Sequence, residues 1–124
     1  MGMLRIDVEL VSPGQRERLA SLANVLVDTG AELSWFPTAT LEALGVVREH
    51  EERFRQATGQ IVTRWTGMVG VHVGGKSVGD HVVFAEPGDL TLLGARSLEG
   101  LNLMVDPVNR RLVDAGAMPA AAVA

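Results

Sequence analysis

Residues Val25–Ala31 read Val-Leu-Val-Asp-Thr-Gly-Ala, a short apolar run that leads directly into a turn. Three consecutive apolar residues are typical of a fully buried strand. This strand delivers the carboxylate of Asp28 onto the turn, and because an unpaired carboxylate is costly to bury, Asp28 needs partners. Gly30 permits close backbone approach, and the Thr29 hydroxyl can hold a turn by bonding a main-chain amide. Taken alone, the motif is equally compatible with an ordinary turn.

Short strands separated by turns surround this motif. Apolar residues alternate with polar ones in 4–10 and again in 69–73, which indicates strands with one buried face. Residues 38–44 and 96–99 have the marks of short helices. The stretch 15–24 is ambiguous, because its first half would also suit a helix. With turn signals every ~8–12 residues, the pattern predicts one mostly β domain, either a barrel or a sandwich.

Length and composition limit the possible functions. The chain has 124 residues, which is enough for one domain and too few for a two-lobed enzyme. It contains no cysteine, so disulfides, thiolate metal sites and a cysteine nucleophile are excluded. Its formal net charge is −4 and no basic stripe is present, so we expect no nucleic-acid partner.

No segment of the sequence indicates a membrane span or a leader peptide. The longest run without a charge, Ala115–Ala124, is too short to cross a membrane and is rich in alanine. We expect a flexible tail over 115–124 behind a domain that covers residues 1–114. Residues 1–5 do not combine a basic region with an apolar one, so no signal peptide is expected and a cytoplasmic location is the default.

Two features suggest phosphate binding or metal binding, but the residues around them do not support either function. Residues 70–77 match the phosphate-loop pattern GxxxxGK[ST], but the residues after them predict a strand, and Gly74–Gly75 predicts a hairpin turn. The histidines His50, His72 and His81 have no helical i, i+4 spacing and no paired carboxylates beside them. We therefore expect no metal site and no cofactor, and we expect His72 and His81 on the solvent faces of paired strands.

Three features that follow one another in the chain give the Asp-Thr-Gly turn a context. The pattern hydrophobic-hydrophobic-Asp-Thr-Gly-Ala occupies 26–31, a glycine-bearing hairpin follows at 57–60, and hydrophobic-hydrophobic-Gly occupies 92–94. Across residues 4–113 the sequence resembles the retropepsin-like (clan AA) aspartic proteases, which are single-domain relatives of retroviral protease. Within this family it resembles the bacterial and archaeal members more than the viral ones. The resemblance implies a closed-barrel-like β fold and a symmetric homodimer in which the two Asp-Thr-Gly loops meet on the twofold axis.

The resemblance also implies a role for each residue of the loop. Asp28 is expected to be the catalytic aspartate, and two copies would activate a water molecule that hydrolyses a peptide bond. Thr29 would bond across the subunits and hold the two loops together. Gly30 would contact the substrate backbone, Ala31 would lie beneath the loop, and Glu32 would bind substrate backbone.

A flap and a pocket wall complete the expected site. The flap tip, which would close over an extended peptide or protein substrate, comprises Ala57, Thr58, Gly59 and Gln60. Leu92 or Leu93 would reach the wall of the pocket, and strands near either terminus would build the dimer interface.

The chain departs from the viral members at two places. Leu33 follows Glu32 where those proteins carry a second acid, and Ala95 follows the final glycine where they carry an arginine, with Arg96 one residue later. These departures leave open a second hypothesis, a non-catalytic peptide-binding or structural dimer module with the same fold. A complete Asp-Thr-Gly motif favours the protease, since binding alone has no need for a buried pair of aspartates.

Overall fold

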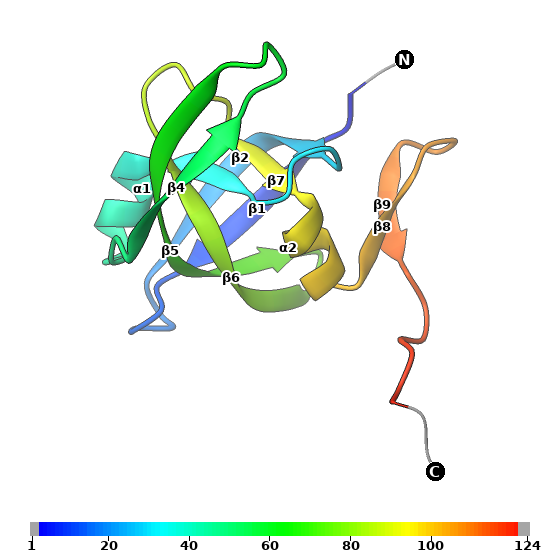
Figure 1. The fold of residues 1–124 in the computed structure, drawn as a ribbon. Helices are drawn as coiled ribbons and strands as arrows, with labels where there is room; N and C mark the ends of the chain where they lie inside the picture. The colour runs from blue at the N-terminus through cyan, green and yellow to red at the C-terminus, as the bar shows by residue number, and fades with distance from the viewer. Residues whose placement is uncertain (1–2, 122–124) are drawn as a thin grey trace.

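Strands dominate the computed structural model, which describes residues 3–121 (Figure 1). The strands are β1 (Arg5–Val11), β2 (Leu19–Asp28), β3 (Trp35–Pro37), β4 (His50–Arg55), β5 (Ile61–Val73), β6 (Lys76–Ala85), β7 (Leu92–Gly94), β8 (Leu103–Asp106) and β9 (Arg111–Asp114). The helices are α1 (Thr38–Ala43) and α2 (Ala95–Gly100). The expectation of a mostly β fold with one or two short helices is therefore confirmed.

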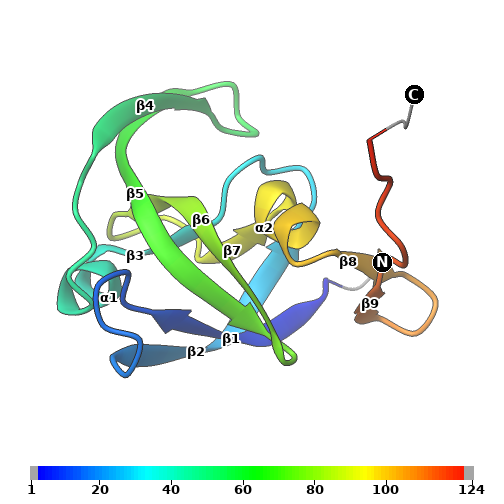
Figure 2. The same cartoon turned by 90° about the horizontal axis from the view of Figure 1, so that it is seen from below.

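Seven of the strands form one sheet in the order β1-β2-β7-β3-β6-β5-β4. β1 also pairs with β5, so the hydrogen-bonded strands from β1 to β5 form a closed ring and β4 extends beyond it. The pairs β2–β7 and β3–β6 are parallel, whereas β4, β5 and β6 form antiparallel hairpins. β8 and β9 form a separate two-stranded sheet that stands beside the main body (Figures 1 and 2).

The core lies inside this ring. Along β1, Val8 and Leu10 are buried while Asp7 and Glu9 keep contact with solvent, as the alternation in the sequence predicts. The largest fully buried side chains come from different strands and from α1, and they include Phe36, Leu41, Val71, Phe84 and Leu93. The chain thus buries its apolar residues in one cluster under the strands.

The connection between β5 and β6 shows that residues 70–77 do not form a phosphate loop. Gly74 and Gly75 have φ values of +55° and +83°, the left-handed conformation that a tight hairpin turn requires at both central residues. The strand β6 follows at once, from Lys76 to Ala85, where a phosphate loop would need a helix. The prediction of a hairpin here is confirmed.

The structure resolves one stretch that the sequence left open, and it corrects one expectation. The ambiguous stretch 15–24 is not helical: β2 begins at Leu19, because Ala20 and Leu22 pair with β1 and local helix propensity yields to that pairing. His81 is not on a solvent face, since its side chain is only 16% exposed and its Nε2 lies 2.7 Å from the buried Thr66 hydroxyl. His72 is half-buried.

The C-terminal segment leaves the hairpin of β8 and β9 without regular secondary structure. Residues 115–121 are exposed, and the last three residues of the expected tail, 122–124, lie outside the described residues. Between residues 3 and 121, the chain has no helix whose length and apolar character would allow it to cross a membrane.

We expect Leu93→Ala to lower the free energy of unfolding by about 2–5 kcal/mol, because it removes a fully buried side chain from the core. Leu19 is the matched control, since it is 51% exposed at the start of β2, and Leu19→Ala should change stability by no more than about 0.5 kcal/mol. Urea unfolding followed by circular dichroism measures both values. Equal losses for the two variants would contradict the position of the core.

Candidate active site

Asp28 is the last residue of β2, and it lies beside the final glycine of the second motif. In the parallel β2–β7 pair, Asp28 stands opposite Gly94, and Leu26 and Val27 stand opposite Leu92 and Leu93. The two motifs that are far apart in the sequence are therefore neighbours in one sheet. A buried strand that ends at this edge places the carboxylate where the chain turns away from the core.

Hydrogen bonds within the turn hold the Asp28 carboxylate. The Gly30 amide donates to Asp28 Oδ1 at 2.9 Å, and the Ala31 amide donates to the Asp28 carbonyl at 3.2 Å. A Cβ atom at Gly30 would lie 3.3 Å from the same Oδ1, which is a tight contact. Glycine therefore allows the backbone to approach the half-buried carboxylate, while Thr29 is exposed at the tip of the turn.

The start of α2 supports the loop from behind. The Ala95 amide donates to the Ala31 carbonyl at 2.8 Å, and the Arg96 amide donates to the Glu32 carbonyl at 3.0 Å. At Gly94 a Cβ atom would lie 2.5 Å from the Leu33 carbonyl oxygen, so no larger residue fits without moving the loop. This close approach explains why the second motif ends in glycine.

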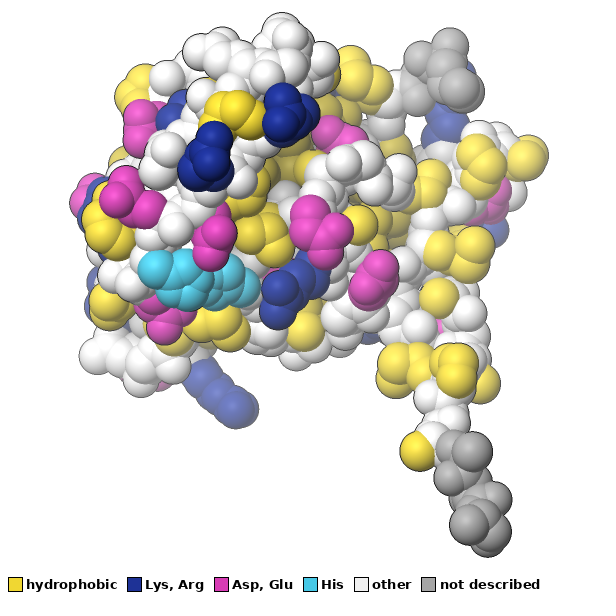
Figure 3. All heavy atoms as spheres, in the orientation of Figure 1, with side chains coloured by type: hydrophobic (Ala, Val, Ile, Leu, Met, Phe, Trp, Pro, Cys, Tyr) yellow, Lys and Arg dark blue, Asp and Glu magenta, His cyan; other side chains and the backbone are white. Residues whose placement is uncertain are grey.

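A groove of about 710 Å³ opens between this loop and the β4–β5 hairpin, which we call the flap. The flap arches toward the loop in Figure 2, and Figure 3 shows a hollow with hydrophobic side chains inside and charged ones around its rim. The lining residues are Asp28, Gly30, Ala31, Glu32, Leu33, Trp35, Arg53, Phe54, Arg55, Gln56, Ala57, Asp89, Leu90 and Leu92.

An aromatic contact joins the flap to the wall of the groove. The rings of Trp35 and Phe54 meet edge to face, with centroids 5.1 Å apart and planes at 64°. Such a pair stabilises the contact by about 0.5–1.5 kcal/mol beyond the burial of its surface. Phe54 lies within the charged strand β4, and its contact with Trp35 shows it facing the groove.

A two-pronged ion pair joins the flap strand β5 to the loop between β6 and β7. Arg64 of β5 donates from Nε to Asp89 Oδ2 at 2.7 Å and from Nη2 to Asp89 Oδ1 at 2.9 Å. The hydrogen bond from Arg64 is the main cause that lowers the pKa of Asp89 below its ordinary value, and the same bond raises the pKa of Arg64. The pair fixes the loop between β6 and β7, which brings Leu90 to the groove.

Comparisons with known proteins agree with this arrangement. A family model described as "Aspartyl protease" matches residues 21–101, which include the Asp28 turn, the flap and β7. The chain belongs to the aspartyl protease family. Among solved structures, it is similar to the EIAV protease complexed with the inhibitor HBY-793, at 19% sequence identity and a TM-score of 0.52, over 79% of this chain and 86% of that chain. No curated protein gave a match.

The retropepsin-like fold of this aspartyl protease brings most of the predicted site residues together. Six of them line the groove: Asp28, Gly30, Ala31, Glu32, Ala57 and Leu92. The others lie elsewhere. Thr29 is exposed on the turn, Leu93 is fully buried in the core, and Thr58, Gly59 and Gln60 form the exposed tip of the flap. Sequence reasoning missed further lining residues, namely Arg53, Arg55, Gln56, Asp89 and Leu90.

The side chain of Arg96 is paired with a carboxylate outside the Asp28 loop. Arg96 Nε lies 3.4 Å from Asp80 Oδ1, while its backbone amide bonds the Glu32 carbonyl. In this aspartyl protease, a main-chain hydrogen bond of Arg96 therefore links α2 to the loop.

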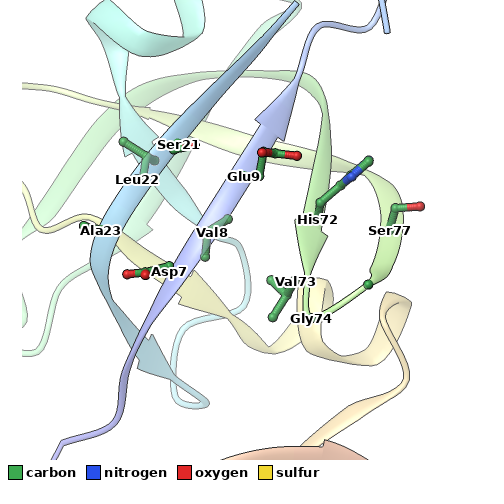
Figure 4. A pocket seen from close by; sticks show the side chains of 11 residues that line it. Asp7, Val8, Glu9, Ser21, Leu22, Ala23, His72, Val73, Gly74 and Ser77 are labelled. Carbon is green, nitrogen blue, oxygen red and sulfur yellow. The ribbon is translucent and has the colours of Figure 1, made fainter. Parts of the chain in front are cut away.

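A second hollow, of about 540 Å³, lies apart from the groove and shares no lining residue with it. Figure 4 shows Asp7, Glu9, His72 and Ser77 around it, on β1, β5 and β6. Asp7 there accepts the Asn24 amide and so serves the β1–β2 pair. Within the part of the chain that the structure describes, no three His, Asp or Glu side chains are placed to share a metal ion.

The Arg64–Asp89 pair predicts acid sensitivity. Because the folded-state pKa of Asp89 is lowered from 3.8, its contribution to stability is present above that value and is lost as the pH falls below it through the folded-state pKa. We expect the melting temperature of Asp89→Asn to fall less steeply below pH 4 than that of the wild type. The control is Glu86→Gln, on the same loop but 3.9 Å from Arg64 and half-exposed. If the melting temperatures of the wild type and Asp89→Asn fall equally steeply below pH 4, the prediction is contradicted.

Proposed function

We propose that the chain is an aspartic endopeptidase that works as a homodimer and hydrolyses peptide bonds with a water molecule activated between two Asp28 carboxylates. One observation carries the proposal: Asp28 is held by the Gly30 amide on the floor of a groove that the flap covers. One chain contributes one such carboxylate, so a twofold pair is needed to supply the second.

The chemistry follows from placing two carboxylates a few ångströms apart. They cannot both ionise cheaply, so the pair holds one proton, which is the known arrangement of aspartic proteases. The ionised member takes a proton from the water, and the protonated member polarises the carbonyl of the scissile bond. In this scheme the hydrogen bond from Gly30 orients Asp28, and the water is the nucleophile.

The remaining site residues take roles that match their positions. The exposed Thr29 bonds to the partner's loop and holds the two turns together. Glu32, Ala57 and Leu92 line the groove and contact an extended peptide. Thr58, Gly59 and Gln60 close over the substrate as the flap tip, and the buried Leu93 anchors β7 beneath the site.

The β8–β9 hairpin is the surface that we assign to the partner chain. A two-stranded sheet alone is marginally stable in water, so it needs a covering layer. Leu103 and Leu112 pack against the core, while Met104 is 52% exposed and stands beside Val113 on the opposite face. Val108, in the turn, is 86% exposed. A second copy of the chain would cover these apolar side chains.

We expect Asp28→Asn to abolish cleavage of an extended-peptide library. In an equimolar mixture with the wild type, activity should fall to about a quarter, because random pairing leaves a quarter of the dimers with two Asp28 residues. Mixing with Asp7→Asn, whose carboxylate lies in the other hollow, should leave activity unchanged. A fall to one half would mean that each chain works alone. Peptide binding without cleavage by the wild type would favour the binding module.

We expect Met104→Lys to shift the chain from dimer to monomer, because it places a charge on the apolar face of the hairpin. Sedimentation velocity over a range of protein concentrations measures the shift. Met68→Lys is the matched control, since Met68 is 42% exposed on β5, which belongs to the other sheet. If both variants remain dimeric, the partner binds elsewhere.

A further inference from the structure

A buried carboxylate that the proposed chemistry does not use lies behind the Asp28 loop. Asp80 of β6 is 5% exposed, and it is surrounded by donors. Its Oδ2 accepts the Ser97 hydroxyl at 2.7 Å, and its Oδ1 accepts the His81 amide at 2.8 Å. Arg96 Nε lies 3.4 Å from the same Oδ1. These contacts compensate the loss of water around the buried charge.

The hydrogen bonds continue from Asp80 to the backbone of β7. Ser34 Oγ lies 2.5 Å from Ser97 Oγ, and both serines are fully buried. The Gly94 amide donates to Ser34 Oγ at 2.9 Å. Each hydroxyl has one proton to donate. Because Ser97 gives its proton to the Asp80 carboxylate, it must accept from Ser34, and Ser34 in turn accepts from Gly94.

The negative charge of Asp80 therefore sets the direction of the hydrogen bonds from Gly94 through Ser34 and Ser97. A neutral group at the end would allow the two hydroxyls to reverse, and a buried network with two arrangements is less rigid than one with a single arrangement. The network is complete, since no buried side-chain nitrogen or oxygen among the described residues lacks a partner.

Two members of the network, Gly94 and Ser34, lie on either side of the Asp28 loop. Gly94 is the residue opposite Asp28 in the β2–β7 pair, and Ser34 is the residue at which the loop leads into β3. The hydrogen bond between them ties the end of the loop to the strand beside its beginning. Ser97, on α2, joins this tie to Asp80 on β6, the strand that pairs with β3.

We propose that Asp80, acting through Ser97 and Ser34, is a positioning residue for Asp28. Catalytic groups must be held within a fraction of an ångström of their productive geometry, and buried second-layer hydrogen bonds supply that constraint. Asp80 touches neither the groove nor its lining residues in the contacts above, so its effect reaches Asp28 through Gly94 and the loop. This inference rests on the proposed peptidase function.

The test compares Ser97→Ala, which breaks the network, with Ser97→Thr, which keeps the hydroxyl. We expect Ser97→Ala to lower kcat about 10–100-fold with KM changed less than about threefold, because a misplaced catalytic group affects the chemical step more than binding. Ser97→Thr should restore most of kcat. Asp80→Asn should also lower kcat, because its one amide oxygen replaces two acceptor oxygens that bond Ser97 and His81.

Thr38→Val is the matched control for loss of a hydroxyl bond. Thr38 Oγ1 donates to the Ala85 carbonyl at 2.8 Å and joins α1 to β6, away from the Asp28 loop. All kinetics are measured well below the melting temperature of each variant. Thr38→Val should lower the melting temperature without lowering kcat. Equal losses of kcat for Ser97→Ala and Thr38→Val would overturn the proposal.

A second readout does not depend on activity. Amide hydrogen exchange, measured by NMR, should show faster exchange at Gly30 and Ala31 in Ser97→Ala than in the wild type or in Thr38→Val. Unchanged exchange at both amides, together with unchanged kcat, would overturn the positioning role. If the wild type cleaves no peptide, the proposed function fails, and the exchange rates still decide whether the network holds the loop.

Discussion

The parallel pairing of β2 with β7 is the constraint on which the site depends. It sets Asp28 opposite Gly94, and Gly94 packs so closely against the Leu33 carbonyl that a side chain there would displace the loop. Main-chain hydrogen bonds from Ala95 and Arg96 then hold the loop along its length. A turn that would be mobile on its own thus becomes a rigid platform for one carboxylate.

The sheet around this platform supplies both cover and support. On the solvent side, the flap reaches the groove wall through the contact of Phe54 with Trp35, while the Arg64–Asp89 pair joins the flap strand β5 to the loop between β6 and β7. On the core side, the hydrogen bonds from Gly94 through Ser34 and Ser97 end on Asp80. Apolar packing alone could fill that space, but it would not give the loop one orientation.

Local sequence signals predicted the elements whose geometry is set by neighbouring residues. The helix expected over 38–44 is α1, and Gly45 follows it with a φ of +74°. The hairpin at Gly74–Gly75 also has the expected conformation. Local signals were not enough where a distant partner decides the outcome. Residues 19–24 became a strand because β1 pairs with them, and His81 turned inward because Thr66 on β5 accepts or donates a hydrogen bond there.

The sequence by itself indicated the family and the candidate aspartate, because a buried strand, Asp-Thr-Gly and a later apolar pair with glycine are short, local patterns. The tertiary structure decided which residues surround that aspartate. Ser34, Asp80 and Ser97 come from three segments, and nothing in the spacing of three common polar residues indicates that they meet. Their contact exists because β7, β3 and β6 are neighbours in the sheet and α2 follows β7, and hydrogen bonds depend on that placement.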